Sequence, residues 1–263
     1  MPKSKQKTET VYGMHPVQTL LKSAASRIQQ LYLLKTRRDQ RMTKLIALAE
    51  KQGVAYQFSS REQLDKLVDG NHQGVVAECS PGEIYDERFL NQLLDGLSEA
   101  PLLLILDGVT DPHNLGACLR TADAVGVHAV IAPKDNAASV NPTVRKVASG
   151  AAELLPYIPV TNLARTMKSL QERGIWLVGT TGDTDKSLYD TDLKGPLGIV
   201  MGAEGEGMRR LTRESCDFLA HIPMLGGVSS LNVSVAVGVC LYEALRQRMG
   251  SGEWKVGSWP APA

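Results

Sequence analysis

From residue 101 onward, short apolar runs alternate with stretches of helical periodicity, and this alternation constrains the fold more than any other feature. The run Leu102–Leu106 is apolar at every position, as expected of a strand that a parallel sheet buries on both faces. Further strands are predicted at 128–132, 175–179, 197–201 and 219–222, and helices at about 115–124, 142–152, 163–173, 208–216 and 231–247. We therefore predict an α/β domain over residues 101–249, with a mostly parallel sheet and helices on both faces.

The residues before this domain show a second, smaller α/β pattern. Strands are predicted at 30–34, 54–58 and 74–78, and helices at 17–21, 40–52 and 61–67. A turn signal at Ser80-Pro81-Gly82-Glu83 ends this pattern. We predict a first domain over 11–80, a linker containing a helix over 81–100, a disordered tail over 1–10 and a second tail over 250–263.

Charge is distributed unevenly between the two predicted domains. Residues 1–80 carry 13 Lys+Arg against 7 Asp+Glu, a net charge of +6, whereas residues 81–263 carry 16 against 21, a net charge of −5. Five basic side chains fall within ten residues: Lys35, Arg37, Arg38, Arg41 and Lys44. The pattern predicts that the first domain binds a polyanion, with a solvated loop and helix face as the alternative interpretation.

Several classes of protein are disfavoured by what the sequence lacks. No apolar run reaches the roughly 18 residues that a membrane span needs, and Met1–Thr10 lacks the apolar core of a secretory signal. The cysteines Cys79, Cys118, Cys216 and Cys240 have no CxxC spacing, and the five histidines have no HxxxH spacing. We expect a cytoplasmic protein with no metal site and no disulfide framework.

Three segments combine glycines with polar side chains, and two of them follow predicted strands. They are Asn114–Arg120, Ile199–Gly207 and Ile222–Asn232. Because glycine lets the backbone approach a ligand, and open α/β sheets bind ligands beyond the carboxyl ends of strands, we expect a cofactor there. The order Gly202-x-x-Gly205-x-Gly207 reverses the dinucleotide fingerprint GxGxxG, the chain has no GxxxxGK[ST] loop, and Ser229 and Ser230 lack the GxSxG elbow of hydrolases.

Taken together, these segments resemble the three motifs of the SpoU (TrmH) family of RNA 2′-O-methyltransferases, over about residues 100–248. The matching patterns are Asn114-x-Gly116-x-x-x-Arg120, Met201-Gly202-x-Glu204-Gly205-x-Gly207, and Ile222-Pro223-Met224 through Ser229-x-Leu231-Asn232-Val233-Ser234-x-Ala236. Residues 11–17 and His72-Gln73-Gly74 resemble the substrate-binding domain that precedes some members. The run Asp107–Asn114 is most similar to members that methylate a guanosine in 23S rRNA.

The resemblance implies a cofactor, a fold and an assembly that periodicity alone does not. The cofactor is S-adenosylmethionine, and the positions that match its contacts are Gly202, Ile222 and Leu231. The fold is a SPOUT-type α/β sheet with a C-terminal trefoil knot, preceded by a small L30e-like RNA-binding domain. Chains are almost always unknotted, so the knot rests on the resemblance alone. Family members act as homodimers, in which the predicted last helix and the glycine loops lie near the subunit contact and Arg120 serves the partner's cofactor.

The family's catalytic positions correspond to Arg120, Asn114, Glu204, Ser230 and Asn232. Arg120 is expected at the reacting ribose hydroxyl, either as a clamp on the adjacent phosphate or as a base. A base role conflicts with the high pKa of arginine, above roughly 12. By position, Asn114 and Ser230 are expected to cap the helices that follow them, with Asn114 also near the substrate. Glu204 is expected to hydrogen-bond ribose or to orient Arg120, and Asn232 to lie just inside the last helix.

Two other functions remain open on the sequence. One is a nucleotide-dependent oxidoreductase or hydrolase on an ordinary doubly wound sheet, which the absence of fingerprint loops disfavours. The other is an RNA-binding protein without activity, which the presence of competent residues at every motif position disfavours. The leading hypothesis is methyl transfer to the ribose 2′-hydroxyl of a guanosine in 23S rRNA.

Overall fold

The chain forms two compact units in the structure, a computed structural model that describes residues 8–82 and 85–250. Unit 1 comprises residues 8–82 and 139–154, and unit 2 comprises residues 85–138 and 155–250. Residues 1–7 and 251–263, which hold most of the two predicted tails, lie outside the described residues. No described helix is long and apolar enough to cross a membrane.

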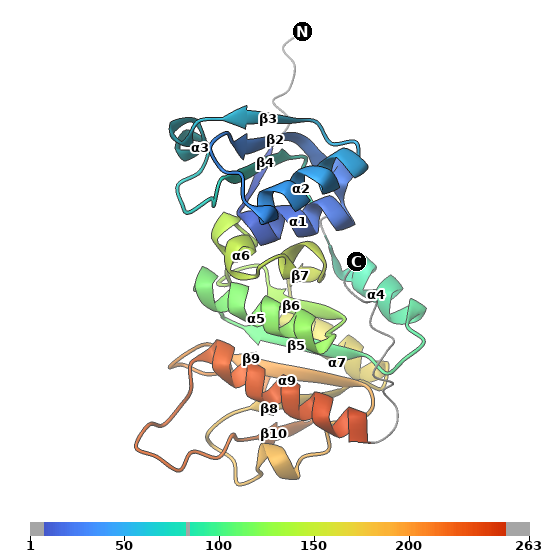
Figure 1. Ribbon diagram of the computed structural model, residues 1–263. Coiled ribbons are helices and arrows are strands. Elements are labelled where there is room, and N and C mark those ends of the chain that lie inside the picture. The colour runs from blue at the N-terminus through green and yellow to red at the C-terminus, as the bar shows by residue number, and fades with distance from the viewer. Residues whose placement is uncertain (1–7, 83–84, 251–263) are drawn as a thin grey trace. The chain divides into compact units, whose positions relative to one another are not determined.

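Unit 1 is built on a mixed four-stranded sheet with the strand order β1-β4-β2-β3 (Figure 1). Strands β1 and β2 are antiparallel to β4, and β3 is parallel to β2. The strands are β1 Glu9–Tyr12, β2 Ile28–Leu34, β3 Tyr56–Ser59 and β4 Val75–Cys79. The helices are α1 Met14–Ser23, α2 Gln40–Lys51, α3 Arg61–Leu67 and α6 Pro142–Val147, with 3₁₀ turns η1 Ala25–Arg27 and η2 Ala151–Glu153.

Side-chain caps and an apolar core explain these elements. Asp39 accepts hydrogen bonds from two backbone amides at the start of α2, and Ser60 and Gln63 form a reciprocal capping box on α3. Leu21 of α1 and Leu31 of β2 belong to one fully buried cluster, to which α2 also contributes. The predicted α/β character of this region is therefore confirmed, with β1 as a strand that the sequence pattern missed.

The helix predicted over 142–152 is wrong in its second half. Helix α6 ends at Val147, and the backbone turns at Ser149 and Gly150, which have φ values of 53° and 102°. A Cβ atom on Gly150 would lie 2.3 Å from Oγ1 of Thr19, so the close approach of α1 requires glycine there. The segment continues as the 3₁₀ turn η2 and packs against α1 within unit 1.

Unit 2 contains a parallel six-stranded sheet in the order β10-β8-β9-β5-β6-β7. The strands are β5 Leu102–Asp107, β6 Ala129–Pro133, β7 Tyr157–Val160, β8 Trp176–Thr180, β9 Leu197–Gly202 and β10 Phe218–Ala220. The helices are α4 Glu87–Gly96, α5 Pro112–Val125, α7 Leu163–Glu172, α8 Arg210–Glu214 and α9 Val233–Gly250, with a 3₁₀ turn η3 Leu188–Asp190. Strand β7 was not predicted, because Pro159 weakens its strand pattern, and it lies at an edge where proline is tolerated.

Helices cover both faces of this sheet, as predicted. Leu90 of α4 and Met167 of α7 belong to a core cluster with Leu103 and Ile105 of β5. Helices α5 and α9 contact each other, and Figure 1 shows them together in front of the strands. The fully buried β5 lies between β6 and β9, so the carboxyl ends of β5 and β9 adjoin at Asp107 and Gly202.

The predicted helix caps are wrong for two of the motif residues. Helix α5 begins at Pro112 and is capped by Asp111, so Asn114 lies within its first turn. Helix α9 begins at Val233, and the amide of Ser234 donates to Oδ1 of Asn232 at 2.9 Å. Asn232 is therefore the capping residue and not, as predicted, a residue just inside the helix, and Ser230 is an exposed residue of the preceding loop.

Candidate functional site

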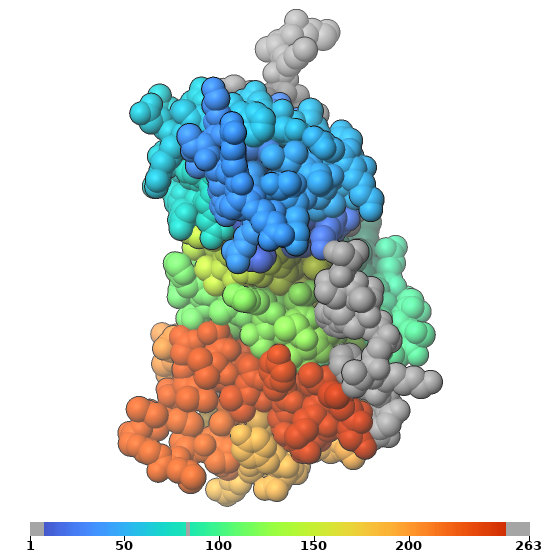
Figure 2. Space-filling view, in the orientation of Figure 1, coloured from blue at the N-terminus to red at the C-terminus, as the bar shows by residue number. Residues whose placement is uncertain are grey.

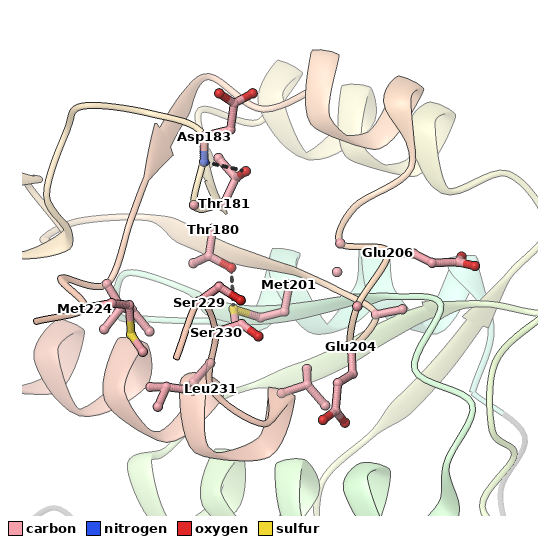
Figure 3. A pocket seen from close by; sticks show the side chains of 18 residues that line it. Thr180, Thr181, Asp183, Met201, Glu204, Glu206, Met224, Ser229, Ser230 and Leu231 are labelled. Carbon is pink, nitrogen blue, oxygen red and sulfur yellow. Dashed lines mark hydrogen bonds between the residues drawn. The ribbon is translucent and has the colours of Figure 1, made fainter. Parts of the chain in front are cut away.

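A cavity of about 530 Å³ opens at the carboxyl end of the unit 2 sheet, as expected for a parallel α/β sheet (Figure 3). Its walls come from the segments that follow β8, β9 and β10 and from the start of α9. The lining residues include Thr180, Thr181, Asp183, Met201, Gly202, Glu204, Glu206, Ile222, Met224, Ser229, Ser230 and Leu231. All three predicted cofactor positions, Gly202, Ile222 and Leu231, thus line one cavity.

The wall after β9 is a tight hairpin. The amide of Ala203 donates to the carbonyl of Gly207 at 3.0 Å, and the amide of Gly207 donates back to Ala203 at 2.9 Å. Gly205 and Gly207 have positive φ values of 82° and 71°. A Cβ atom on Gly202 would lie 2.1 Å from the backbone of Gly207 and of Met208. Glycine is required at 202 because the returning chain fills that space, and not, as predicted, to leave room for a ligand.

The three sequence motifs meet through side-chain amides and one carboxylate. Nδ2 of Asn232 donates to Oδ1 of Asn114 at 3.0 Å and lies 3.3 Å from Oε2 of Glu204. Nδ2 of Asn114 also donates to Oε2 of Glu204, at 3.4 Å. Asn114 is 90 positions from Glu204 and 118 from Asn232 in the chain, and the fold brings the three residues into one cluster, the Asn114–Glu204–Asn232 cluster. In Figure 3 Glu204 and Glu206 leave the hairpin in different directions.

The cavity combines an apolar wall with hydroxyls and acids. Its titratable lining side chains are the carboxylates Asp183, Glu204 and Glu206, and none of its lining residues in the described chain is basic. The hydroxyl of Thr180 donates to Sδ of Met201 at 3.0 Å (Figure 3). A ligand that carries positive charge would be stabilised by such a rim, whereas an anionic ligand would be repelled.

Of the predicted catalytic residues, Glu204 and Ser230 line the cavity, and Asn114 and Asn232 adjoin it through their contacts with Glu204, whereas Arg120 does neither. It lies in the last two turns of α5, is exposed, and is not among the residues that line the cavity. Within residues 8–82 and 85–250, no hydrogen bond or ion pair holds its guanidinium. The side chain is therefore available to a group from outside this chain.

The thiols near the site are inert. Burial raises the pKa of Cys118 and of Cys240 to about 12, and burial and neighbouring carboxylates do the same for Cys216. All three are protonated at neutral pH, so none supplies a thiolate nucleophile. Among the described residues, no group of three or more His, Cys, Asp and Glu side chains is arranged to hold a metal ion.

The lining also includes residues that the sequence placed near strand ends without naming them as site residues. Thr180 ends β8 and Thr181 follows it, and Met224 and Ser229 stand within the third motif segment. The available signal was their position just after predicted strands, which is where an open α/β sheet binds ligands.

Comparison with known protein families identifies the family of this chain. Residues 101–242 match the model of the SpoU rRNA Methylase family, and residues 10–85 match a model described as RNA 2′-O ribose methyltransferase substrate binding. The chain belongs to the SpoU rRNA methylase family. The predicted family resemblance and the predicted α/β fold class are confirmed, and an oxidoreductase or hydrolase on an ordinary doubly wound sheet is set aside.

Two relatives with similar sequences, from different bacteria, carry the same name. The chain is 60% identical over 240 residues to the 23S rRNA (guanosine-2′-O-)-methyltransferase RlmB of Pseudomonas aeruginosa, covering 91% of this chain and 97% of the relative. It is 59% identical over 242 residues to RlmB of Escherichia coli K12, covering 92% and 99%. Almost the whole length of these proteins is therefore matched.

A solved structure of another SpoU methyltransferase has the same fold. AviRb from Streptomyces viridochromogenes, determined in complex with the cofactor AdoMet, matches with a TM-score of 0.76 at 26% identity. The match covers 92% of this chain and 91% of AviRb.

Proposed function

We propose that this protein transfers the methyl group of S-adenosylmethionine to the ribose 2′-hydroxyl of a guanosine in 23S rRNA. The observation that carries the proposal is the Asn114–Glu204–Asn232 cluster, in which all three family motifs meet beside a glycine-walled cavity. The RlmB relatives, at about 60% identity over nearly the full chain, support the nucleotide and the RNA.

The cavity fits the proposed methyl donor. Its volume of about 530 Å³ lies in the usual range for sites of this kind, roughly 300–1,000 Å³. Ile222 and Leu231 offer apolar surface to adenine, and the hydroxyls of Thr181 and Ser230 offer polar partners. The carboxylates on the rim complement the positive sulfonium and amino groups of the donor.

The chain's own residues provide orientation and charge control for the transfer. When bound, S-adenosylmethionine supplies a methyl group on a sulfonium sulfur. The Asn114–Glu204–Asn232 cluster then orients the ribose beside it, since amide and carboxylate groups can each bond a hydroxyl. Alignment of this kind is worth up to about 7–11 kcal/mol of the barrier. Arg120 holds the adjacent phosphate and stabilises charge developing on the ribose oxygen, with direct proton acceptance as the alternative role.

Replacing Arg120 with alanine is expected to lower the rate of methyl transfer by about 10²–10³-fold, because a charged group at the developing oxyanion is lost. The dissociation constant of S-adenosylmethionine should stay unchanged, since the contacts proposed for Arg120 are with the RNA phosphate and the ribose oxygen and not with the donor. The measurement is transfer of labelled methyl to undermethylated 23S rRNA. Arg120→Lys should keep part of the rate if the residue is a clamp. A wild-type rate in Arg120→Ala would contradict this role, and no transfer by the wild type would favour an inactive RNA-binding protein.

We infer a homodimer in which Arg120 of one subunit serves the cavity of the other. Two observations support it: Arg120 is exposed and without a partner in the described chain, and the cavity lining has no basic residue of its own. Leu225 and Val228 before α9 are 100% and 64% exposed, and Tyr242 on α9 is 54% exposed. Figure 2 shows α9 and the segment before it on the near surface of unit 2. This apolar surface is suited to a subunit contact.

Mixing two inactive variants tests the dimer. Arg120→Ala keeps an intact cavity, and Gly202→Ala keeps an intact Arg120. After subunit exchange, half of the dimers are mixed and each contains one complete site, so about a quarter of wild-type activity should return. Mixing Arg120→Ala with Arg120→Gln is the matched control and should restore nothing. Absence of recovery in exchanged dimers would show that Arg120 serves its own chain.

Further features of the proposal rest on the family. The trefoil knot rests on membership of the SpoU family alone. The division into a substrate-binding domain over 11–80, a linker over 81–100 and a catalytic domain over 101–249 is supported by the two matching models, which cover residues 10–85 and 101–242. In unit 1 the basic residues Lys35, Arg38, Arg41 and Lys44 are exposed, which suits contact with RNA phosphates. A cytoplasmic location is supported by the free thiols of the four cysteines.

A further inference from the structure

The carboxyl end of β5 carries a buried carboxylate to which the proposed function assigns no role. Asp107 is the last residue of β5, and its side chain is fully buried, with 0% of its surface exposed. A buried carboxylate is costly unless charge and hydrogen bonds compensate it. We therefore expect hydrogen bonds or a neighbouring positive charge to offset the desolvation cost of the Asp107 carboxylate.

One residue, Arg209, compensates it at three points. The backbone amide of Arg209 donates to Oδ2 of Asp107 at 2.9 Å, and Nε donates to Oδ1 at 2.7 Å. Nη2 of Arg209 lies 2.6 Å from Oδ1. The guanidinium thus contacts one carboxylate oxygen through two nitrogens, and the backbone amide satisfies the other oxygen, so side chain and backbone of Arg209 are both held by Asp107.

The contact closes the cavity's glycine hairpin at its base. In the sheet register Asp107 lies opposite Gly202, the residue where the hairpin leaves β9. Arg209 lies two residues after Gly207, where the hairpin returns. Both ends of the loop are therefore fixed to the same residue, one by the strand ladder and the other by the side chain of Asp107.

Asp107 also starts the segment that carries Asn114. Gly108 follows it with a φ value of 85°, and a Cβ atom there would lie 3.5 Å from Cβ of Ala203 in the hairpin. A shift of the hairpin relative to β5 would therefore change the spacing between Glu204 and Asn114, which is already at the long limit of 3.4 Å.

We propose that Asp107 and Arg209 are positioning residues, whose ion pair holds the Gly202–Gly207 hairpin in the conformation that binds the methyl donor and presents Glu204 to Asn114. The inference rests on the proposed function, because it assigns the hairpin as a wall of the donor site. Neither side chain lines the cavity, so both act through the backbone they fix.

The test uses Arg209, whose side chain is 56% exposed, so that its replacement opens no cavity in the core. Because the replacement leaves the buried Asp107 with only the amide donor, thermal unfolding of each variant is measured alongside, and donor binding is compared in the folded proteins. In full-length Arg209→Gln, calorimetry should give a dissociation constant for S-adenosylmethionine about tenfold higher, or about 1.4 kcal/mol. Amide hydrogen exchange of residues 203–207 in the donor-free protein should accelerate at least severalfold. Arg209→Lys, which keeps the charge but not the fork, should fall between Arg209→Gln and the wild type.

The matched control lies one residue further along the chain. Arg210 pairs with Glu214 on the surface of α8, and its side chain is 83% exposed. Arg210→Gln should leave both donor affinity and hairpin exchange unchanged. Wild-type affinity and exchange in a folded Arg209→Gln would overturn the inference while leaving the proposed function intact. If the wild type itself binds no donor, the proposed function fails. Faster amide exchange of the hairpin in Arg209→Gln would in that case still show that the ion pair holds the hairpin.

Discussion

Replacing Gly202 with alanine is expected to raise the dissociation constant of S-adenosylmethionine at least roughly a hundredfold, a loss of about 2.7 kcal/mol of binding free energy. The added methyl group would lie 2.1 Å from the carbonyl carbon of Gly207 and from the amide nitrogen of Met208. Both are backbone atoms, so no change of side-chain rotamer can relieve the overlap. The hairpin must move away from β9, which breaks the paired hydrogen bonds between Ala203 and Gly207 and displaces a wall of the cavity.

A second glycine of the same strand provides the matched control. A Cβ atom on Gly198 would lie 2.7 Å from Cδ2 of Leu177, the end of a flexible side chain. Gly198→Ala should therefore lower the free energy of unfolding by about 1–3 kcal/mol through overpacking, but leave donor affinity nearly unchanged. Calorimetric titration of both variants, with thermal unfolding alongside, separates loss of the site from loss of stability. Donor binding by Gly202→Ala within threefold of the wild type would show that the hairpin is not a wall of the donor site.

The elements that the sequence predicted are those with a strong local pattern. Strand β5 was predicted because burial on both faces demands apolar residues at every position of Leu102–Leu106. Strand β1 was missed because Glu9–Tyr12 is short and half polar, and it forms only by pairing antiparallel with β4, about 65 residues later. The break after Val147 was missed because it depends on Thr19, which no local pattern connects to Gly150.

The candidate site likewise has parts that a local sequence pattern predicted and parts that depend on the tertiary structure. Glycines at strand ends located the cavity, and resemblance to the SpoU family brought in the polar motif residues. The meeting of Asn114, Glu204 and Asn232 could not be read from spacing, since sheet topology alone brings together segments about 90 and 118 residues apart. The pairing of Asp107 with Arg209 was missed for the same reason, although an acid that ends a fully buried strand is a usable signal for a buried ion pair.

Removing the carboxylate of Glu153 is expected to destabilise unit 1 by about 3–5 kcal/mol, because it leaves two largely buried guanidinium groups to share the single carboxylate of Glu9. The side chain of Glu153 is 1% exposed. Its Oε2 accepts from Nη1 of Arg27 at 3.0 Å, and its Oε1 accepts from Nη1 of Arg145. Glu9 joins the same two arginines from the other side, at 3.1 and 3.0 Å. The cluster therefore alternates two acids and two bases, and without Glu153 it carries a net positive charge.

Chemical and thermal unfolding of full-length Glu153→Ala measures this loss in the transition that belongs to unit 1. Glu153→Gln, which keeps an acceptor but not the charge, should lose less. Glu214→Gln, which removes an exposed pair on α8, should change the free energy of unfolding by no more than about 0.5 kcal/mol. Donor affinity should be unchanged in all three variants, because the cavity is lined by residues of unit 2. A loss below about 1 kcal/mol in Glu153→Ala would contradict the expected cost of an uncompensated buried charge.

A double variant distinguishes the cost of breaking the cluster from its net contribution to stability. Replacing a buried ion pair by apolar residues of similar volume is often neutral, since the desolvation cost of both charges disappears with their attraction. Arg145→Met combined with Glu153→Leu should therefore recover most of the stability that Glu153→Ala loses, leaving Glu9 to pair with Arg27. Within unit 1, the segment 139–154, which lies between β6 and β7 in the sequence, is joined to residues 8–82 by this cluster and by the close approach of Gly150 to Thr19. If the double variant is as unstable as Glu153→Ala, the charged cluster itself stabilises the attachment of that segment. Apolar residues of similar volume then cannot replace it.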